Sequence, residues 1–159
     1  MNFDFSPEQE QFRQQIRRFF EKNDGLNEGR AILDKKSENY SAPIWEGLAK
    51  LGVQAIAIPE MHDGLGLGAL ELCVAAEEIG RALAPIPFLS SICICAEAIR
   101  LFGSAEQQAK WLPGLADGST IGTWGYAEDS RAADAKGTQL KSGRISAISR
   151  NYRKGSSCR

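Results

Sequence analysis

Residues 59–81 of the chain read PEMHDGLGLGALELCVAAEEIGR, and this stretch organises the sequence on both sides of it. Pro59 ends an apolar run, and three glycines then alternate with two leucines over residues 64–68. A helical pattern begins at Ala69, directly after the last glycine. The stretch therefore predicts a tight glycine loop that leads into a helix over residues 69–84.

The remainder of residues 1–118 has the caps and the apolar spacing of helices. The stretches at residues 6–9 (SPEQ) and 104–107 (SAEQ) match the capping box that opens a helix. A further helix is expected to open at Pro43. The run at 88–102 is apolar nearly all round, which predicts a buried central helix. Together these elements predict an all-α, bundle-like domain of five or six helices.

The spacing also predicts which helix faces are buried. In the first helix the expected inward residues are Phe12, Ile16, Phe19 and Phe20. Its basic residues are expected on a solvated face: Arg13, Arg17, Arg18 and Lys22. In the helix at 69–84 the expected inward residues are Leu72, Ala76, Ile79 and Leu83.

Charge is divided unevenly along the chain. Residues 1–128 hold 11 Lys or Arg and 18 Asp or Glu, whereas residues 129–159 hold 8 and 2, so net charges of -7 and +6 sum to the overall -1. Residues 121–126 have a strand-like composition, and residues 135–159 are rich in Ser, Gly, Lys and Arg. The last segment is expected to be an irregular basic tail. A nucleic-acid-binding arm is the alternative for it.

Four cysteines, one histidine and the absence of a long apolar run limit the classes of function. One Cys-x-Cys at 93–95 and no second ligand pair do not match a metal site, so Cys73, Cys93 and Cys95 are expected to be buried, reduced thiols. This expectation favours a cytoplasmic location. No stretch approaches the roughly 20 apolar residues of a membrane span, and acidic residues interrupt any signal peptide.

The glycine loop permits a dinucleotide-binding interpretation, because Gly64-x-Gly66-x-x-Ala69 matches a loose form of that fingerprint. The glycines would admit a pyrophosphate to the N-terminus of the following helix. However, a polar loop separates the fingerprint from the apolar run, and no second strand follows the helix. A loop that turns tightly and packs against the helix is the favoured interpretation.

Several motifs, in order along residues 1–134, resemble those of the acyl-CoA dehydrogenase family. They are the SPEQ opening, the Pro59-Glu60 and Gly64-Leu65-Gly66 loop, the EEIGR of 77–81 and the GSAEQQAKWLP of 103–113. The resemblance implies a helical domain at 1–118 and the beginning of a β domain at 119–134. It also implies α,β-desaturation of an acyl-CoA thioester with FAD, electron transfer to an electron-transfer flavoprotein, and assembly as an oligomer.

The resemblance implies roles for particular residues. The start of the 88–102 helix resembles the family helix that lines the acyl chain, which implies substrate contacts at Pro87, Ser90, Ser91 and Ile94. The WGYAE of 124–128 lies where the family has a flavin-contacting segment, which implies FAD contacts at Trp124, Tyr126 and Ala127. For the substrate candidates, plain core packing remains the alternative. For the flavin candidates, the alternative is an ordinary half-buried strand.

The family's catalytic base lies in a part that residues 1–134 do not match, so no catalytic residue is assigned. Structural or surface roles are expected for Glu60, Glu77 and Glu78, and an incidental loop position for His62. The chain is therefore expected to be the N-terminal part of a dehydrogenase, inactive alone, with an end that resembles a truncation or a frame shift. The alternative is a non-catalytic helical subunit or interaction module that pairs with a complete dehydrogenase subunit.

Overall fold

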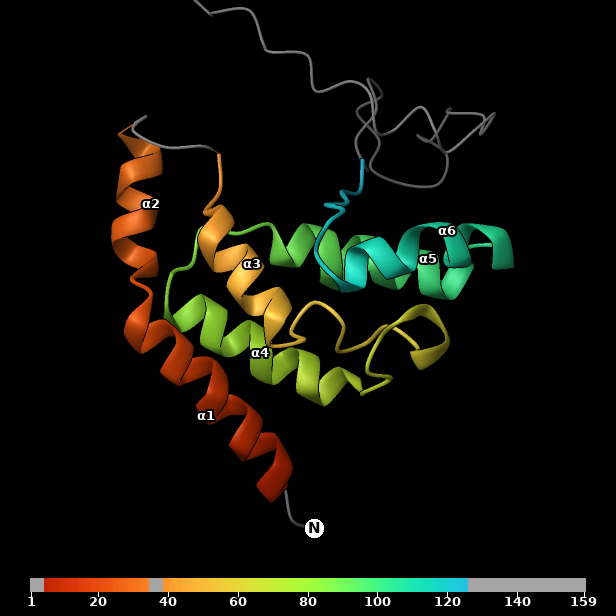
Figure 1. Cartoon of the computed structure of the whole chain (residues 1–159), viewed down its shortest axis with the longest axis horizontal. Helices are drawn as coiled ribbons and strands as arrows, with labels where there is room; N and C mark the ends of the chain where they lie inside the picture. Colours follow the sequence, from red (N-terminus) through yellow and green to blue (C-terminus); the bar gives the residue numbers. More distant parts are fainter. Residues whose placement is uncertain (1–4, 35–38, 126–159) are drawn as a thin grey trace, which may run out of the picture. The chain divides into compact units, whose positions relative to one another are not determined.

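The computed structural model describes residues 5–34 and 39–125. The chain divides into two compact units, residues 1–124 and 125–159, and the fold below is that of the first unit. Its elements, in order, are α1 (Pro7–Lys22), α2 (Gly25–Leu33), α3 (Ala42–Lys50), η1 (Glu60–His62), α4 (Ala69–Arg81), η2 (Leu89–Ala96), α5 (Glu97–Phe102) and α6 (Ala105–Ala116) (Figure 1). η1 is a 3-10 turn and η2 is a π-helix. The all-α prediction is confirmed over these described residues.

Two helices begin at the capping boxes that the sequence predicts. The Ser6 hydroxyl accepts from the Gln9 amide (3.2 Å), and the Gln9 side chain accepts from the Ser6 amide (2.9 Å). The same exchange joins Ser104 and Gln107 at the start of α6. Each box satisfies backbone donors that a helix leaves unpaired at its first turn.

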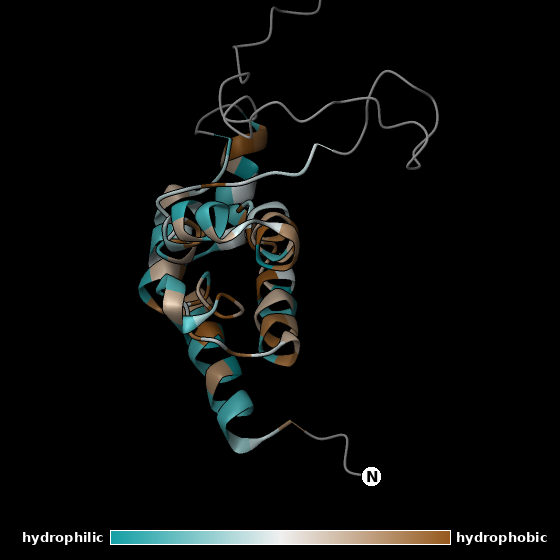
Figure 2. Cartoon of the chain, turned by 90° about the vertical axis from the view of Figure 1, so that its right-hand side faces the viewer, coloured by the Kyte–Doolittle hydropathy of each residue, from teal (hydrophilic) through white to brown (hydrophobic). Residues whose placement is uncertain are grey.

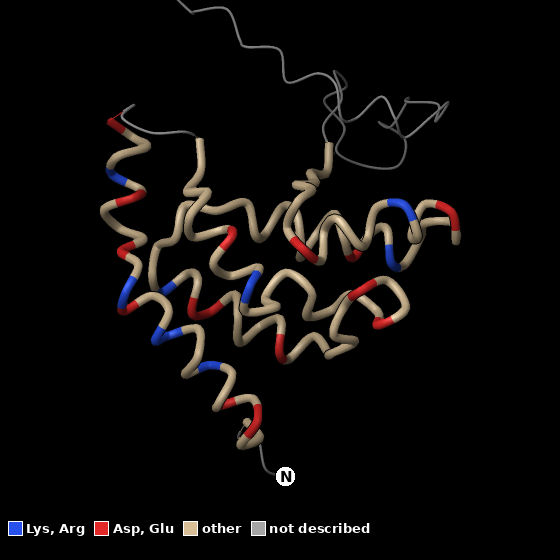
Figure 3. Tube along the Cα trace, in the orientation of Figure 1, with Lys and Arg blue, Asp and Glu red and all other residues tan. Residues whose placement is uncertain are grey.

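Helix α1 packs along α4, and a buried carboxylate lies between them. The side chain of Glu78 is fully buried, and Arg17 binds it with two donors at 2.6 and 3.1 Å. Arg81 adds a third donor at 2.9 Å. Arg13 lies 3.7 Å from the same carboxylate and donates to Glu77 at 2.8 Å. Figure 3 shows the basic positions of α1 running beside the acidic positions of α4.

This network corrects two predictions about helix faces. Arg13 is only 8% exposed, so the basic residues of α1 are not all solvated. Helix α4 buries Val74, Ala75, Glu78 and Ile79, so of the predicted inward residues only Ile79 is buried. The helical spacing assigned only apolar residues to the inward face, whereas Glu78 is buried because guanidinium groups surround it.

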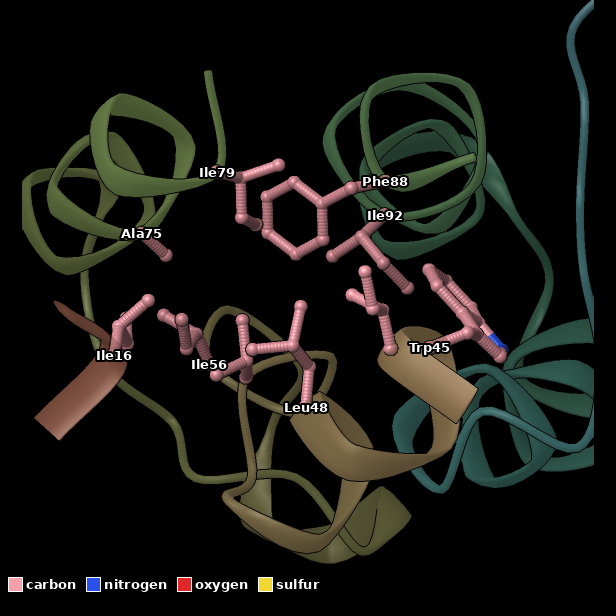
Figure 4. Close-up of a cluster of buried hydrophobic side chains, with 10 residues drawn as sticks. Ile16, Trp45, Leu48, Ile56, Ala75, Ile79, Phe88 and Ile92 are labelled. Atoms are coloured by element: carbon pink, nitrogen blue, oxygen red, sulfur yellow. The ribbon is translucent and has the colours of Figure 1, made fainter. Parts of the chain in front are cut away.

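A hydrophobic core joins α1, α3, α4 and η2 (Figure 4). Its buried residues are Ile16, Ile44, Trp45, Leu48, Val53, Ile56, Ala75, Ile79, Phe88 and Ile92. Helix α1 contributes through an amphipathic pattern, visible in Figure 2 as alternating hydrophilic and hydrophobic bands beside the N-terminal trace. A second cluster packs α6 against η2 and the segment before η1: Ala55, Ile58, Ala96, Leu112, Leu115 and Ala116.

Residues 88–102 do not form the single buried central helix that was predicted. They form η2 and then α5, and Leu89, Ile94, Leu101 and Phe102 are each more than 40% exposed. Helix α6 continues past Pro113 to Ala116, and Leu112, Leu115 and Ala116 lie in the second core cluster. The cysteines also differ from the prediction of buried thiols, because Cys73 is exposed and Cys93 and Cys95 are half-buried.

The glycine loop lies against the segment that precedes it. Its backbone amides donate to that segment in three successive bonds: Leu65 to Ala55 O, Gly66 to Ile58 O and Leu67 to Ile56 O, at 2.8–2.9 Å. A Cβ on Gly64 would lie 1.9 Å from the Ile58 carbonyl oxygen, so only glycine fits there. Gly66 has a φ of 61°, which also favours glycine.

Residues 121–125 are irregular, so the strand expected to begin at Ile121 is not found in the described part of that segment. A strand needs a partner for its backbone groups, and only helices are formed in the described residues. The proposed domain boundary at residue 134 and the basic tail of 135–159 lie outside the described residues.

The first prediction concerns the buried carboxylate. We expect Glu78→Gln to lower the free energy of unfolding by about 2–3 kcal/mol, because it leaves guanidinium groups without their shared anion. Glu77→Gln is the matched control, since Glu77 is 59% exposed, and we expect a loss of less than about 1 kcal/mol. Urea denaturation of both variants checks this. Equal losses of unfolding free energy in the two variants would contradict the conclusion that Glu78 is the carboxylate that holds α1 on α4.

The second prediction concerns pH. Hydrogen bonding from Arg17 outweighs desolvation and holds the pKa of Glu78 below its ordinary value of 4.5. A carboxylate with a lowered folded-state pKa stabilises the fold above its unfolded-state pKa and loses that effect as pH falls through the folded-state pKa. The stability difference between the natural chain and Glu78→Gln should therefore be constant near neutrality and should shrink below about pH 4.5. Thermal melts from pH 7 to pH 3 measure it, and a difference that grew on acidification would contradict the account.

The third prediction concerns the glycine loop. We expect Gly64→Ala to destabilise the fold by about 3 kcal/mol, because the added methyl group overlaps the Ile58 carbonyl. Gly80→Ala is the control in the helix that follows, where an added Cβ meets nothing within 4 Å. That substitution should stabilise the fold by about 0.5–1 kcal/mol. Similar melting temperatures for the two variants would show that the loop is not packed as described.

Candidate functional site

The glycine loop does not form a phosphate site, although its fingerprint permits one. Its amides at residues 64–67 all donate to backbone carbonyls of the preceding segment. At the N-terminus of α4, the Gly68 amide donates to the carboxylate of Glu71 at 2.9 Å. Bonds from Gln9 and from the backbone lower the pKa of Glu71, so an anion already caps this helix. The packing interpretation of the glycines is therefore the one that the structure supports.

The expected acyl-facing residues lie at the start of η2. Ser90 is half-buried, and its hydroxyl donates to the Pro87 carbonyl at 3.2 Å. Ile94, one turn further on, is 42% exposed. Ser91 differs from both, because it is fully buried. Its hydroxyl oxygen accepts from the Gly122 amide at 3.0 Å, 31 positions along the chain.

The chain leaves α6 through a turn that is held against α3. The Trp45 indole N–H donates to the Gly118 carbonyl at 2.8 Å. Gly118 has a φ of 76°, and a Cβ there would lie 3.2 Å from both Trp45 Nε1 and Ala49 Cβ. The Thr120 amide then donates to Gly114 O at 2.8 Å. Only glycine meets both the backbone and the packing requirements at Gly118.

The segment that follows α6, residues 118–123, is called the exit segment below, and it also contacts η2. A Cβ on Gly122 would lie 2.5 Å from the Cys95 sulfur, so the backbone of this segment lies directly on the thiol. Burial raises the pKa of Cys95, and this outweighs the opposing backbone hydrogen bond from Thr123. The Cys95 thiol therefore packs against the backbone of this segment.

The exit segment leads to the expected flavin-facing residues. Trp124 is 51% exposed, and an added Cβ on Gly125 would meet nothing within 4 Å. Tyr126 and Ala127 lie outside the described residues. The structure therefore places one expected flavin contact, Trp124, two residues after the amide that is bonded to Ser91.

Of the remaining candidate groups, Glu77 and Glu78 have structural partners. Glu77 and Glu78 bind the arginines of α1. His62 is 6% exposed and is the last residue of η1, which packs on α6, so it is a buried residue. Glu97 binds Arg100 through two bonds, of 2.6 and 2.7 Å. No catalytic base is identified among the described residues, and they contain no cluster of potential metal ligands.

Sequence reasoning missed the residues that hold the exit segment: Trp45, Gly118, Gly122 and Cys95. The helical spacing indicates only an inward position for Trp45, and no local pattern distinguishes Gly118 or Gly122 as a packing contact. The bond between Ser91 and Gly122 joins distant positions, and one sequence has no signal for such a contact.

No helix within residues 5–34 and 39–125 is long and apolar enough to cross a membrane.

Comparison with known proteins identifies relatives of this helical domain. The family model described as acyl-CoA dehydrogenase, N-terminal domain, matches residues 6–119. A probable acyl-CoA dehydrogenase of Bacillus subtilis, YngJ, is 28% identical over 143 residues, which are 89% of this chain and 37% of that protein. The chain thus spans about a third of the length of this curated relative.

Solved structures show the same architecture. The acyl-CoA dehydrogenase of Bacillus anthracis, complexed with FAD, matches with a TM-score of 0.73 and 28% identity over 86% of this chain and 23% of that one. The ChsE4–ChsE5 complex of Mycobacterium tuberculosis matches with a TM-score of 0.68 and 28% identity over 77% of this chain and 34% of that one. The family match covers nearly all of the helical unit described above, and the chain belongs to the acyl-CoA dehydrogenase family.

Proposed function

We propose that the chain supplies the N-terminal helical part of an FAD-dependent acyl-CoA dehydrogenase, where it forms a wall of the acyl pocket and packs against other subunits. The observation that carries the proposal is the bond between Ser91 and the Gly122 amide. It brings the segment with the expected substrate contacts beside the segment with the expected flavin contacts. The proposed domains are residues 1–118, 119–134 for the start of a β domain, and 135–159 for the basic tail.

The substrate wall of this proposal is the start of η2. Pro87, Ser90 and Ile94 present an apolar surface with one hydroxyl, which suits an acyl chain. The Ser90 hydroxyl donates to Pro87 O, so its donor is occupied within the turn. Ser91 supports this wall from behind, because its side chain has no exposed surface.

The proposed flavin contacts are Trp124, Tyr126 and Ala127. The half-exposed indole of Trp124 fits this role, because a flat apolar surface at the edge of the helical domain remains open to a flavin ring. Bound FAD supplies the acceptor for the hydride that leaves the β-carbon of the acyl chain. The chain's own contribution is to place Trp124 at a fixed distance from η2 and to exclude water on that side.

We propose that the 159 residues do not turn over acyl-CoA by themselves. Hydrogen-bond donors engage Glu71, Glu78 and Glu97 and lower the pKa of each carboxyl group, which makes each a weaker base for an α-proton. An electron-transfer flavoprotein is the proposed electron acceptor, and an oligomer is the proposed assembly. The proposed location is the cytoplasm, with which the free thiols of Cys73, Cys93 and Cys95 are in keeping.

A second candidate function is that of a non-catalytic subunit that pairs with a complete dehydrogenase subunit. One observation favours it, namely the structural match to a complex of two different proteins, ChsE4 and ChsE5. Co-expression with a complete dehydrogenase and purification through a tag on this chain separates the two functions. A stable complex that binds more FAD than the complete subunit alone would favour the second.

The fourth prediction tests the proposed function in a chimera. Residues 5–125 replace the matching part of the Bacillus anthracis dehydrogenase, and turnover is followed with acyl-CoA substrates of increasing length. We expect Ile94→Phe to lower kcat/KM for long chains by about tenfold, because the larger side chain fills the pocket, and to leave the shortest substrate nearly unaffected. Trp124→Ala should reduce FAD retention.

Leu101→Phe is the matched control, because Leu101 is also exposed, at 55%, but lies on α5 and outside the proposed wall. It should leave the chain-length profile unchanged. An active chimera in which Ile94→Phe and Leu101→Phe gave the same profile would contradict the proposed acyl wall. Full FAD retention in Trp124→Ala would contradict the proposed flavin contact.

A further inference from the structure

The exit segment is attached to the helical domain along its length, first to α3 and α6 and then to the expected acyl-facing helix η2. Trp45 and Gly114 hold its beginning through the bonds to Gly118 and Thr120. The attachment to η2 comes later, where Ser91 accepts from the Gly122 amide at 3.0 Å. The Thr123 backbone also bonds to the Cys95 thiol of η2, and Trp124 is the next residue.

The contact at Gly122 has the features of a built attachment and not of a chance surface bond. The Ser91 side chain is fully buried, so its hydroxyl oxygen has no access to water as an alternative donor. A Cβ on Gly122 would overlap the Cys95 sulfur at 2.5 Å and the Cys95 Cβ at 2.9 Å, so the close approach also requires a glycine. The buried Ser91 hydroxyl and the lack of a side chain on Gly122 are therefore both needed for this contact.

The adjacent serine provides a contrast. Ser90 is half-buried and bonds only to Pro87 O, within its own turn. The two neighbouring serines thus differ in hydrogen-bond partner as well as in exposure. Ser90 is available on the surface of η2, whereas Ser91 connects η2 to the chain that leads away from the domain.

We propose that Ser91 is a positioning residue, whose hydroxyl, with the Cys95 thiol packed beside it, sets the place of Trp124 relative to the acyl-facing helix η2. Its significance for catalysis rests on the proposed function, in which Trp124 contacts the flavin and η2 contacts the acyl chain. The attachment itself does not depend on that function, because it lies wholly within the helical domain.

This proposal predicts that a substitution at Ser91 changes the structure locally and does not destabilise the whole domain. A residue that served only the core would loosen the whole domain when altered. A positioning residue releases the exit segment from η2 and leaves the rest of the domain in place. Backbone amide exchange separates the two cases, because each amide reports the opening of its own hydrogen bond.

The experiment is amide hydrogen exchange by NMR on the full chain, combined with ¹⁹F spectra of fluorotryptophan-labelled protein. In Ser91→Ala we expect the Gly122 amide to exchange about tenfold faster, because its acceptor is lost. The Trp124 fluorine signal should shift. The Thr120 and Leu67 amides, which bond to Gly114 O and Ile56 O, should keep their exchange rates and so report an intact domain.

Two further variants complete the test. Ser90→Ala is the matched control and should change neither the Gly122 amide nor the Trp124 signal. Gly122→Ala leaves Ser91 in place but forces the segment off Cys95, so it should move the Trp124 signal as Ser91→Ala does. This variant keeps the proposal testable if Ser91→Ala does not fold.

The proposal is overturned if Gly122 exchanges at an unchanged rate in Ser91→Ala, or if Thr120 and Leu67 accelerate together with it. It is also overturned if Gly122→Ala leaves the Trp124 signal in place. None of these readouts involves FAD or acyl-CoA. Failure of the attachment is therefore distinguishable from failure of the proposed function, which the chimera measures.

Discussion

The hydrogen bond from the Trp45 indole to the Gly118 carbonyl joins the centre of the helical domain to the point where the chain leaves it. Trp45 is 2% exposed and lies in the core with Ile44 and Leu48 from the same helix. The Trp45 carbonyl accepts from the buried Gln54 side chain at 2.8 Å, which fixes α3 to the segment after it. Trp45 therefore packs in the core and also holds the start of the exit segment, so α3 connects the two.

Electrostatics and close backbone packing support this centre from the other side. The arginines of α1 hold that helix on α4 through Glu78, and a buried charge of this kind is stable only while its donors surround it. The glycine loop brings the chain from α3 back to the start of α4 by backbone bonds at Leu65, Gly66 and Leu67. The loop whose composition suggested a nucleotide site thus orients α4, and its amides are used for that purpose.

Much of the fold was predictable from local rules, and the errors have physical causes. Capping boxes at Ser6 and Ser104 depend on residues three apart, so they are visible in one sequence. The burial of Glu78 depends on a helix 61 positions away, and periodicity analysis counts any glutamate as exposed. The π-helical form of η2 and the exposure of Ile94 depend on tertiary packing. For the site, the candidate substrate residues lie in η2 or just before it, and their role stays a prediction. The bond that joins Ser91 to Gly122 was beyond reach of any local pattern.

The central claim is that the start of η2 forms the acyl-facing wall. Its most direct test is photolabelling of the FAD-loaded chimera with an acyl-CoA analogue that has a diazirine at the end of its acyl chain. Trypsin cleaves after Lys50, Arg81 and Arg100, so residues 51–81 and 82–100 fall in separate peptides. The account predicts that label appears in the 82–100 peptide, which contains Pro87, Ser90 and Ile94. Label confined to the 51–81 peptide, which contains the glycine loop, would contradict it.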